Sequence, residues 1–306
     1  MDDFFCFTHH RINDHVYVVR ESFGFDRRLP NSYFFIGVVI GEQRVAVFDS
    51  GNGATPGLRP YIERHITGTG RQMDCFLSHN HLDHIGGCMQ FDRRYLHKDD
   101  FNEAEITWAT DLNRHFFDDE SDLAQFCCHD PSVLTYCREH YLRNRPTLED
   151  FIPVEDGEEF DLGGITLRVM HTPGHSRGSC CYYDVQDHIA FTGDAIPASG
   201  LSLSPKLTPE GESETLAYLK RAKREWNADT LIVGGHHFLW GMDLVDKLLD
   251  GFREISEAKN LGRDIVAPPP PFKYQNGNPR KRIPEPGVFM MRHFHHDLDM
   301  NYRVRV

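Results

Sequence analysis

The sequence lacks the features that mark secreted, membrane-spanning and nucleic-acid-binding proteins. No apolar run in its 306 residues approaches the length of a membrane helix. The first residues show no basic segment followed by an apolar one, as a secretory signal would. The net charge of −13 disfavours contact with nucleic acid phosphates or anionic membranes. We therefore expect a cytoplasmic protein that binds a small-molecule substrate, with no nucleic acid or membrane partner. The oligomeric state is left open, a homodimer included.

The cysteines likewise follow no metal-binding or disulfide pattern. None of the 8 cysteines forms a C-x-x-C pair, so a structural zinc knuckle is not expected. Two pairs are adjacent, Cys127-Cys128 and Cys180-Cys181, which is typical of free thiols rather than of a disulfide framework. We expect these thiols to be buried and reduced, in keeping with a cytoplasmic location.

What the sequence does contain is an alternation of strand-like and helix-like segments. β-branched and aromatic residues predict strands at 16–19, 33–40, 44–48, 74–77, 151–154, 165–171, 180–183, 188–191 and 230–233. Apolar residues spaced by three and four predict helices at 216–226 and 245–255, and 59–66 reads as a helix with Pro60 near its first turn. This alternation indicates an α/β protein.

Two regions depart from the alternation. Residues from about 97 to 150 are polar and aromatic with helical spacing, and we interpret them as a helical insertion. The last part, 268–306, begins with four prolines that form a rigid linker, and strand-like pieces at 288–292 and 302–306 predict a terminal hairpin. We therefore predict one domain over 1–267, with the hairpin packed on it.

The densest chemical signal is the run His79-Asn80-His81-Leu82-Asp83-His84, directly after a predicted strand. His79 and His81 are two residues apart, so at a strand end they point the same way and can bind one cation. Asp83 and His84 follow at the turn into a helix, where they can face a second cation. Four ligand-type residues within six positions rarely gather for packing alone.

Three further ligand-type residues follow later predicted strands. They are His175, which closes the run HTPGH that begins at His171; Asp194, which follows Gly193; and His236, which follows two glycines. Strands that repeatedly end in glycine and a ligand residue predict strand ends that meet at one sheet edge. Open α/β sheets place their binding sites at such an edge.

Taken in order, the runs HNHLDH, HTPGH, FTGD and GGH resemble the metallo-β-lactamase superfamily from about residue 16 to about residue 240. The resemblance implies a four-layer αβ/βα sandwich of two mixed β-sheets with outer helices. It also implies two divalent metal ions, with zinc favoured and iron or manganese also suited to these ligands. The implied ligands are His79, His81 and His175 for the first ion, Asp83, His84 and His236 for the second, and Asp194 as the bridge between them. Asp49, in the run FDSG, would orient a ligand histidine, and His171 would be structural.

The implied activity is hydrolysis of a carboxylic ester, thioester or lactone by a metal-bound hydroxide, with Asp83 and Asp194 as catalytic residues. True β-lactamase activity is not expected, because His84 and Asp194 are both present and no cysteine stands at a ligand position. The alternatives are a phosphodiesterase, an iron-dependent persulfide dioxygenase and a metal-binding domain without activity. We expect His237 to lie outside the metal ligands. Arg177 is either an anion contact or a surface residue.

Overall fold

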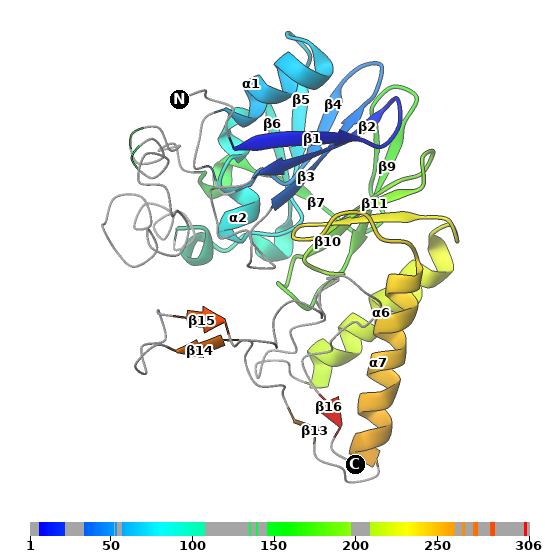
Figure 1. Ribbon diagram of the computed structural model, residues 1–306. Helices are drawn as coiled ribbons and strands as arrows, with labels where there is room; N and C mark the ends of the chain where they lie inside the picture. The colour runs from blue at the N-terminus through cyan, green and yellow to red at the C-terminus, as the bar shows by residue number, and fades with distance from the viewer. Residues whose placement is uncertain are drawn as a thin grey trace.

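The computed structural model describes residues 6–21, 34–51, 53, 57–107, 135, 139, 146–196 and 209–260, and four short strands between 265 and 304. Within these residues two β-sheets face each other, and helices cover their outer sides (Figure 1). The predicted α/β sandwich of two mixed sheets is confirmed.

The first sheet has seven strands, in the order of the chain. They are β1 (Phe7–Arg11), β2 (Val16–Glu21), β3 (Phe34–Ile40), β4 (Val45–Phe48), β5 (Met73–Phe76), β6 (Arg93–His97) and β7 (Ile152–Val154). Strands β1 to β4 are antiparallel, whereas β4 to β7 are parallel. The parallel strands are connected through α1 (Leu58–Ile62), which continues as a π-helical turn over Glu63–Thr67, and through α2 (Leu82–Ile85). Short 3₁₀ turns cover Cys88–Gln90, Lys98–Asp100 and Leu148–Asp150.

The second sheet has five strands, in the order β12-β11-β10-β9-β8. Their bounds are Glu159–Asp161 (β8), Thr166–His171 (β9), Cys180–Asp184 (β10), Ile189–Gly193 (β11) and Leu231–Gly234 (β12). Only β11 and β12 are parallel. The helices α6 (Pro209–Glu225) and α7 (Asp243–Asn260) pack on the outer face of this sheet.

Alternation along the strands produces three apolar layers between the four layers of backbone. In β4, Val45 and Val47 face the core under α1 and α2, whereas Phe48 faces the second sheet. The ring of Phe48 stacks on that of Phe191, with 3.9 Å between centroids and 4° between planes. Gly37 permits this contact, because a Cβ at that position would come within 2.3 Å of the Phe191 ring. Buried on both sides, β4 is apolar throughout, as expected of an inner strand.

The strand directions bring five loops to one edge of the sandwich. In the first sheet β4 and β5 are parallel, so the residues after them lie side by side. In the second sheet β10 is antiparallel to both β9 and β11, and β12 is parallel to β11. Strands β9, β11 and β12 therefore run in one direction and end at the same edge. The predicted ligand residues follow four of these strands, β5, β9, β11 and β12, and Asp49 follows β4.

Within the two main sheets, three strands, β1, β6 and β8, were not predicted, whereas the nine predicted there occur within about two residues of their expected bounds. The predicted insertion begins at the last residue of β6 and ends before β7, its neighbour in the sheet. Residues 103–107, 135 and 139 are helical, but the rest of 108–145 lies outside the described residues, so the insertion stays a prediction.

The chain after α7 contributes two short pairs of strands. Ile265–Val266 (β13) pairs with Arg303–Val304 (β16), and Phe272–Tyr274 (β14) pairs with Arg282–Pro284 (β15). Residues 288–292 lie outside the described residues, so the predicted hairpin and its packing on the main domain stay predictions.

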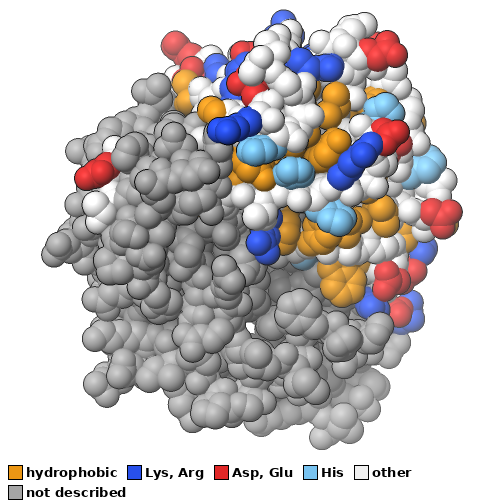
Figure 2. Space-filling model, turned by 45° about the horizontal axis from the view of Figure 1, so that its top comes forward, with side chains coloured by type: hydrophobic (Ala, Val, Ile, Leu, Met, Phe, Trp, Pro, Cys, Tyr) orange, Lys and Arg blue, Asp and Glu red, His pale blue; other side chains and the backbone are white. Residues whose placement is uncertain are grey.

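Among the described residues, no helix is long and apolar enough to span a membrane. The five described cysteines, Cys6, Cys75, Cys88, Cys180 and Cys181, are buried, as expected. Histidine side chains also lie at the surface among hydrophobic and basic ones, as Figure 2 shows for one face. On β1, His9 and His10 are exposed, and His9 Nδ1 lies 2.8 Å from the Tyr61 hydroxyl.

Candidate metal centre

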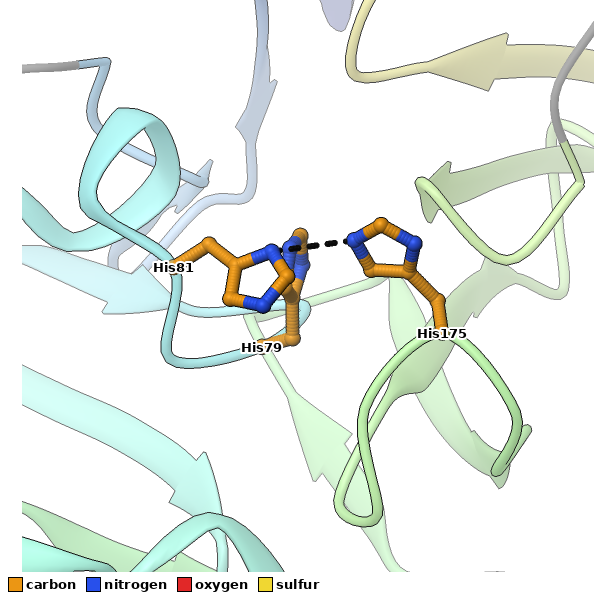
Figure 3. Close-up of side chains that lie close together, drawn as sticks. All are labelled: His79, His81 and His175. Carbon is orange, nitrogen blue, oxygen red and sulfur yellow. Dashed lines mark hydrogen bonds between the residues drawn. The ribbon is translucent and has the colours of Figure 1, made fainter. Parts of the chain in front are cut away.

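His79, His81 and His175 form the first group of potential ligands, called here the tris-histidine group. His79 and His81 follow β5, and His175 lies in the loop between β9 and β10. His175 Nε2 is 3.0 Å from His81 Nδ1 (Figure 3). The three rings are steeply inclined to one another, with interplanar angles of 74°, 89° and 70°. One nitrogen of each ring lies within 4.8 Å of the other two, so the three can converge on a single cation.

Asp83, His84 and His236 form the second group, called here the mixed group. Asp83 and His84 lie in α2, directly after the first loop, and His236 follows β12. Asp83 Oδ2 is 3.1 Å from His236 Nε2 and 3.7 Å from His84 Nε2. Two imidazoles and a carboxylate suit zinc, iron or manganese.

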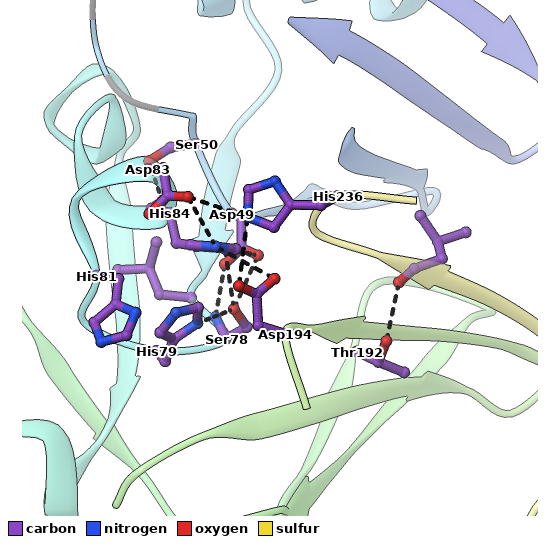
Figure 4. A network of polar contacts seen from close by, with 12 residues as sticks. Asp49, Ser50, Ser78, His79, His81, Asp83, His84, Thr192, Asp194 and His236 are labelled. Atoms are coloured by element: carbon purple, nitrogen blue, oxygen red, sulfur yellow. Dashed lines mark hydrogen bonds and ion pairs between the residues drawn. The ribbon is translucent and has the colours of Figure 1, made fainter. Parts of the chain in front are cut away.

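Asp194 lies between the two groups, at the end of β11 (Figure 4). Its Oδ2 is 3.6 Å from His175 Nε2 in one group and 3.4 Å from His236 Nε2 in the other. Its Oδ1 is 3.7 Å from His84 Nε2. A single carboxylate is therefore within reach of both groups, which is the position that the sequence assigned to a bridging ligand.

Asp49 and Ser78 form hydrogen bonds with the Nδ1 atoms of two of the histidines, on the side of each ring that faces away from the site. Asp49 Oδ2 accepts a hydrogen bond from His84 Nδ1 at 2.8 Å and from the Ser78 hydroxyl at 2.9 Å. Because that hydroxyl donates to Asp49, it accepts from His79 Nδ1, 2.9 Å away. The Nε2 atoms of His79 and His84 are thereby left unprotonated toward the site once the rings are neutral. Asp49 has a φ of 61°, an uncommon conformation for a residue other than glycine.

The tris-histidine group favours neutral rings. Loss of solvent and the nearby His84 lower the pKa of His79 well below its usual value, and they also lower the pKa of His81. Burial lowers the pKa of His175 to about 4, although Asp194 opposes that shift. Neutral imidazole is the form that binds a metal ion, so this group is ready for a cation at pH 7.

The mixed group favours charged rings. Burial acts to lower the pKa of His236, but the carboxylates of Asp194 and Asp83 outweigh it and raise this pKa to about 10. The pKa of His84 is likewise raised, against burial, by Asp49, Asp83 and Asp194. Burial acts to raise the pKa of Asp83, yet His84 and His236 hold it at about 2. In the metal-free protein this group is therefore a network of ion pairs.

The residues present fit two divalent ions. His79 Nε2 and His84 Nε2 are buried and have no hydrogen-bond partner, a costly arrangement that a bound cation would relieve. Gly235 leaves room beside them, because a Cβ there would come within 2.5 Å of His84 Cε1 and 2.6 Å of Asp194 Oδ1. The tris-histidine group would hold one ion and the mixed group the other, with Asp194 shared.

The neighbouring histidines and Arg177 lie outside these groups. His237 packs against Gly234, where a Cβ would come within 1.9 Å of the His237 ring, and it belongs to no group of converging ligand atoms among the described residues. His171 Nε2 donates a hydrogen bond to the Arg177 carbonyl at 2.8 Å. The Arg177 side chain is exposed.

Another set of residues, His97, Asp99 and His171, has ligand atoms within the same range. The rings of His97 and His171, however, are stacked, with 4.0 Å between centroids and 11° between planes. Parallel rings do not direct their nitrogens at a common point, so this group lacks the geometry of the tris-histidine group.

Two supporting residues were missed in the sequence. Ser78 lies directly before the first ligand histidine and was not singled out, and Asp100 fell within the predicted insertion. Asp100 is buried and accepts hydrogen bonds from both loops of the tris-histidine group. Its only signal in the sequence was its position soon after an apolar pair, Tyr95-Leu96.

The chain belongs to the metallo-β-lactamase superfamily, because the sequence model described as "Metallo-beta-lactamase superfamily" matches residues 26–237. Among solved structures, a metallo-beta-lactamase family protein from Thermus thermophilus covers 81% of this chain and 82% of its own. The TM-score is 0.52 and the identity 20%. The sec-alkylsulfatase Pisa1 from Pseudomonas sp. covers 84% of this chain and 43% of its own, with a TM-score of 0.60 and 15% identity. Both likenesses support the fold.

Curated relatives include enzymes named for thioester substrates. The acyl-coenzyme A thioesterase MBLAC2 of Homo sapiens is 29% identical over 206 residues, which is 62% of this chain and 66% of the relative. The hydroxyacylglutathione hydrolase GloC of Haemophilus influenzae is 27% identical over 165 residues, which is 52% of this chain and 66% of the relative. The match thus spans just under two thirds of each relative's length.

Proposed function

We propose that the protein is a dinuclear metal-dependent hydrolase of thioesters, with zinc as the favoured ion and the cytoplasm as its location. The observation that carries the proposal is Asp194, which lies within 3.6 Å of a nitrogen in the tris-histidine group and within 3.4 Å of one in the mixed group. A carboxylate shared by two sets of ligands is the arrangement of a two-metal hydrolytic site.

The thioester is favoured over the other ester-type bonds by the relatives. MBLAC2 is named for acyl-coenzyme A and GloC for hydroxyacylglutathione, and both names describe hydrolysis of a carbon–sulfur bond. The reaction adds water across that bond and yields a carboxylic acid and a thiol. The five described cysteines are buried, so none of them is placed to act as the nucleophile in place of water.

Divalent ions in this centre would supply the Lewis acidity that lowers the pKa of a water molecule and polarises the substrate carbonyl. The protein's own residues orient the ligand histidines and transfer protons. Asp49 and Ser78 fix the direction of two histidines through hydrogen bonds of 2.8 and 2.9 Å. Asp83 is the more exposed of the two central carboxylates, at 31% against 18% for Asp194. We therefore assign to the Asp83 carboxylate the transfer of a proton from the attacking water to the leaving thiolate.

The test is a comparison of matched substrates. Metal-free protein is reconstituted with two equivalents of zinc and presented with an acyl thioester, the oxygen ester of the same acyl group, a lactone and a phosphodiester. We expect the thioester to be hydrolysed with the highest kcat/KM, measured as release of free thiol. Asp194→Asn serves as the inactive control.

A phosphodiester turned over faster than the thioester would refute the substrate assignment. Full activity after complete removal of metal, verified by elemental analysis, would refute the mechanism. Activity that appears only with iron and consumes dioxygen would favour the oxygenase alternative instead.

A further inference from the structure

Asp100, at the end of the 3₁₀ turn Lys98–Asp100, connects the two loops that carry the tris-histidine group. Its Oδ2 accepts hydrogen bonds from the Asn80 backbone N–H at 3.1 Å and from the Ser176 hydroxyl at 2.7 Å. Its Oδ1 accepts from the Gly178 backbone N–H at 2.6 Å. Asn80 stands between the two ligand histidines of the first loop, and Ser176 directly follows the ligand of the second.

Further contacts tighten the same junction. The Asn80 side chain donates to the Asp100 carbonyl at 3.2 Å and to Glu105 Oε2 at 2.9 Å. Gly178 approaches so closely that a Cβ there would come within 2.5 Å of the Asp100 backbone nitrogen and 2.7 Å of its Cγ. The second loop can therefore close on Asp100 only because this position is glycine.

The metal ligands do not explain why a carboxylate is buried here. Asp100 is only 2% exposed, and it belongs to no group of converging ligand atoms among the described residues. A buried carboxylate is costly unless its oxygens are satisfied. Three donors, drawn from two loops, satisfy this one, and hydrogen bonds to an ionised acceptor are roughly twice as strong as neutral ones. An amide in its place would offer one acceptor oxygen instead of two.

We propose that Asp100 is a positioning residue that fixes the distance between the His79–His81 loop and the His175 loop, and so sets the affinity of the tris-histidine group for its cation. The proposal rests on the proposed metal-binding function. The mixed group is supported separately, through the hydrogen bond from His84 to Asp49. The two ions should therefore respond differently to a change at Asp100.

The experiment is a zinc titration of metal-free protein in competition with a chromophoric chelator, which resolves the two equivalents. We expect Asp100→Asn to weaken one equivalent about 10–100-fold, the usual effect of losing an outer partner of a metal ligand. The other equivalent should keep its affinity. Asp99→Asn is the matched control, because it removes the same charge from the adjacent, exposed residue. Ser176→Ala deletes one of the three hydrogen bonds and should weaken the same equivalent by less.

Combining Asp100→Asn with a second substitution in either ligand group identifies which ion is affected. With His236→Ala, which cripples the mixed group, Asp100→Asn should still weaken the remaining equivalent. With His175→Ala, which cripples the tris-histidine group, it should change nothing. Amide hydrogen exchange of metal-free protein gives a readout without metal, because Asn80 and Gly178 should exchange faster in Asp100→Asn.

Wild-type affinity for both equivalents in Asp100→Asn would overturn the proposal. An equal loss at both equivalents would also overturn it, because that result indicates a role in folding alone. If Asp100→Asn does not fold, Ser176→Ala decides the question by the same criteria. Wild-type protein that binds no divalent ion would overturn the proposed function itself, and this inference with it.

Discussion

Adding zinc to the metal-free protein at pH 7 should release protons from the mixed group and almost none from the tris-histidine group. Burial acts to lower the pKa of His236, but Asp194 and Asp83 raise it to about 10, so the ring carries a proton at pH 7. The pKa of His84 is also raised well above its usual value, in spite of burial, by Asp49 and its neighbouring carboxylates. A metal ion binds only the neutral ring, so each histidine must lose its proton.

The free-energy cost of deprotonation follows from the difference between the pKa of the histidine and the pH of the solution. For His236, whose side chain is 19% exposed, the gap of about three pH units corresponds to about 4 kcal/mol of binding free energy spent on deprotonation at pH 7. Below the raised pKa, each displaced proton makes the apparent affinity rise about tenfold per pH unit. With two such histidines the mixed group should gain about 100-fold per unit, and the gain should level off as pH passes through the raised pKa values.

In the tris-histidine group the histidine pKa values are shifted in the opposite direction. Burial lowers the pKa of His79 and His175, so their rings are already neutral at pH 7. The affinity of this equivalent should be flat above about pH 6.5, the ordinary pKa of histidine.

The assay is isothermal titration calorimetry at pH 7 in buffers of different protonation enthalpy, which counts the protons released with each equivalent. Competition titrations between pH 6.5 and 8.5 give the slopes. In His236→Ala, which should lose the ion of the mixed group, the proton release assigned to that group should disappear, whereas the tris-histidine group should still bind its ion with almost no proton release. Equal proton release by both equivalents, or a flat pH dependence for both, would refute the reasoning, because the mixed group would then be neutral before the ion arrives.

Three further predictions concern single residues of the centre. Asp194→Asn should lower occupancy of both ions and reduce kcat by more than about 100-fold, beyond the usual effect of losing an outer partner; near wild-type turnover with two tightly bound ions would contradict the bridge. His236→Ala should lose the ion of the mixed group and most activity, whereas His237→Ala should keep both ions by elemental analysis; the reverse result would place the ligand at 237. Asp49→Asn should weaken the ion at His84 about 10–100-fold in a competition titration while the sheets stay folded by circular dichroism, and unchanged affinity would show that the 2.8 Å hydrogen bond does not orient the ring.

The positions of the seven proposed ligand residues could be predicted because they follow apolar strands that are recognisable by themselves. The structure brings all seven into two groups at one edge, with Asp194 between them. His236 could be preferred over its neighbour His237 only through the resemblance, since adjacent histidines look alike in a sequence. The structure separates them, because the ring of His237 packs against Gly234.

What could not be predicted depends on contacts between distant parts of the chain. Asp100 lies 20 residues from Asn80 and 76 from Ser176, so no local pattern connects them. Strand β1 was missed because four of its five residues are exposed, which leaves no apolar alternation to detect. Strand β6 begins with two arginines and lies directly before the predicted insertion, so it offers only a short apolar stretch to detect, although it pairs with a strand on each side.

Each group of ligands takes members from both sheets. The ligands that follow strand β5 of the first sheet are His79, His81, Asp83 and His84. The second sheet provides His175 and His236. At this edge the backbone hydrogen bonds from Phe35 to Gly235 and from Cys180 to Ser78, of 2.9 and 2.8 Å, also cross between the sheets. A bound cation would therefore connect the two sheets at this edge of the sandwich. Because each ion would be held by ligands from both sheets, separation of the sheets at this edge would weaken its binding, and bound ions should in turn oppose that separation.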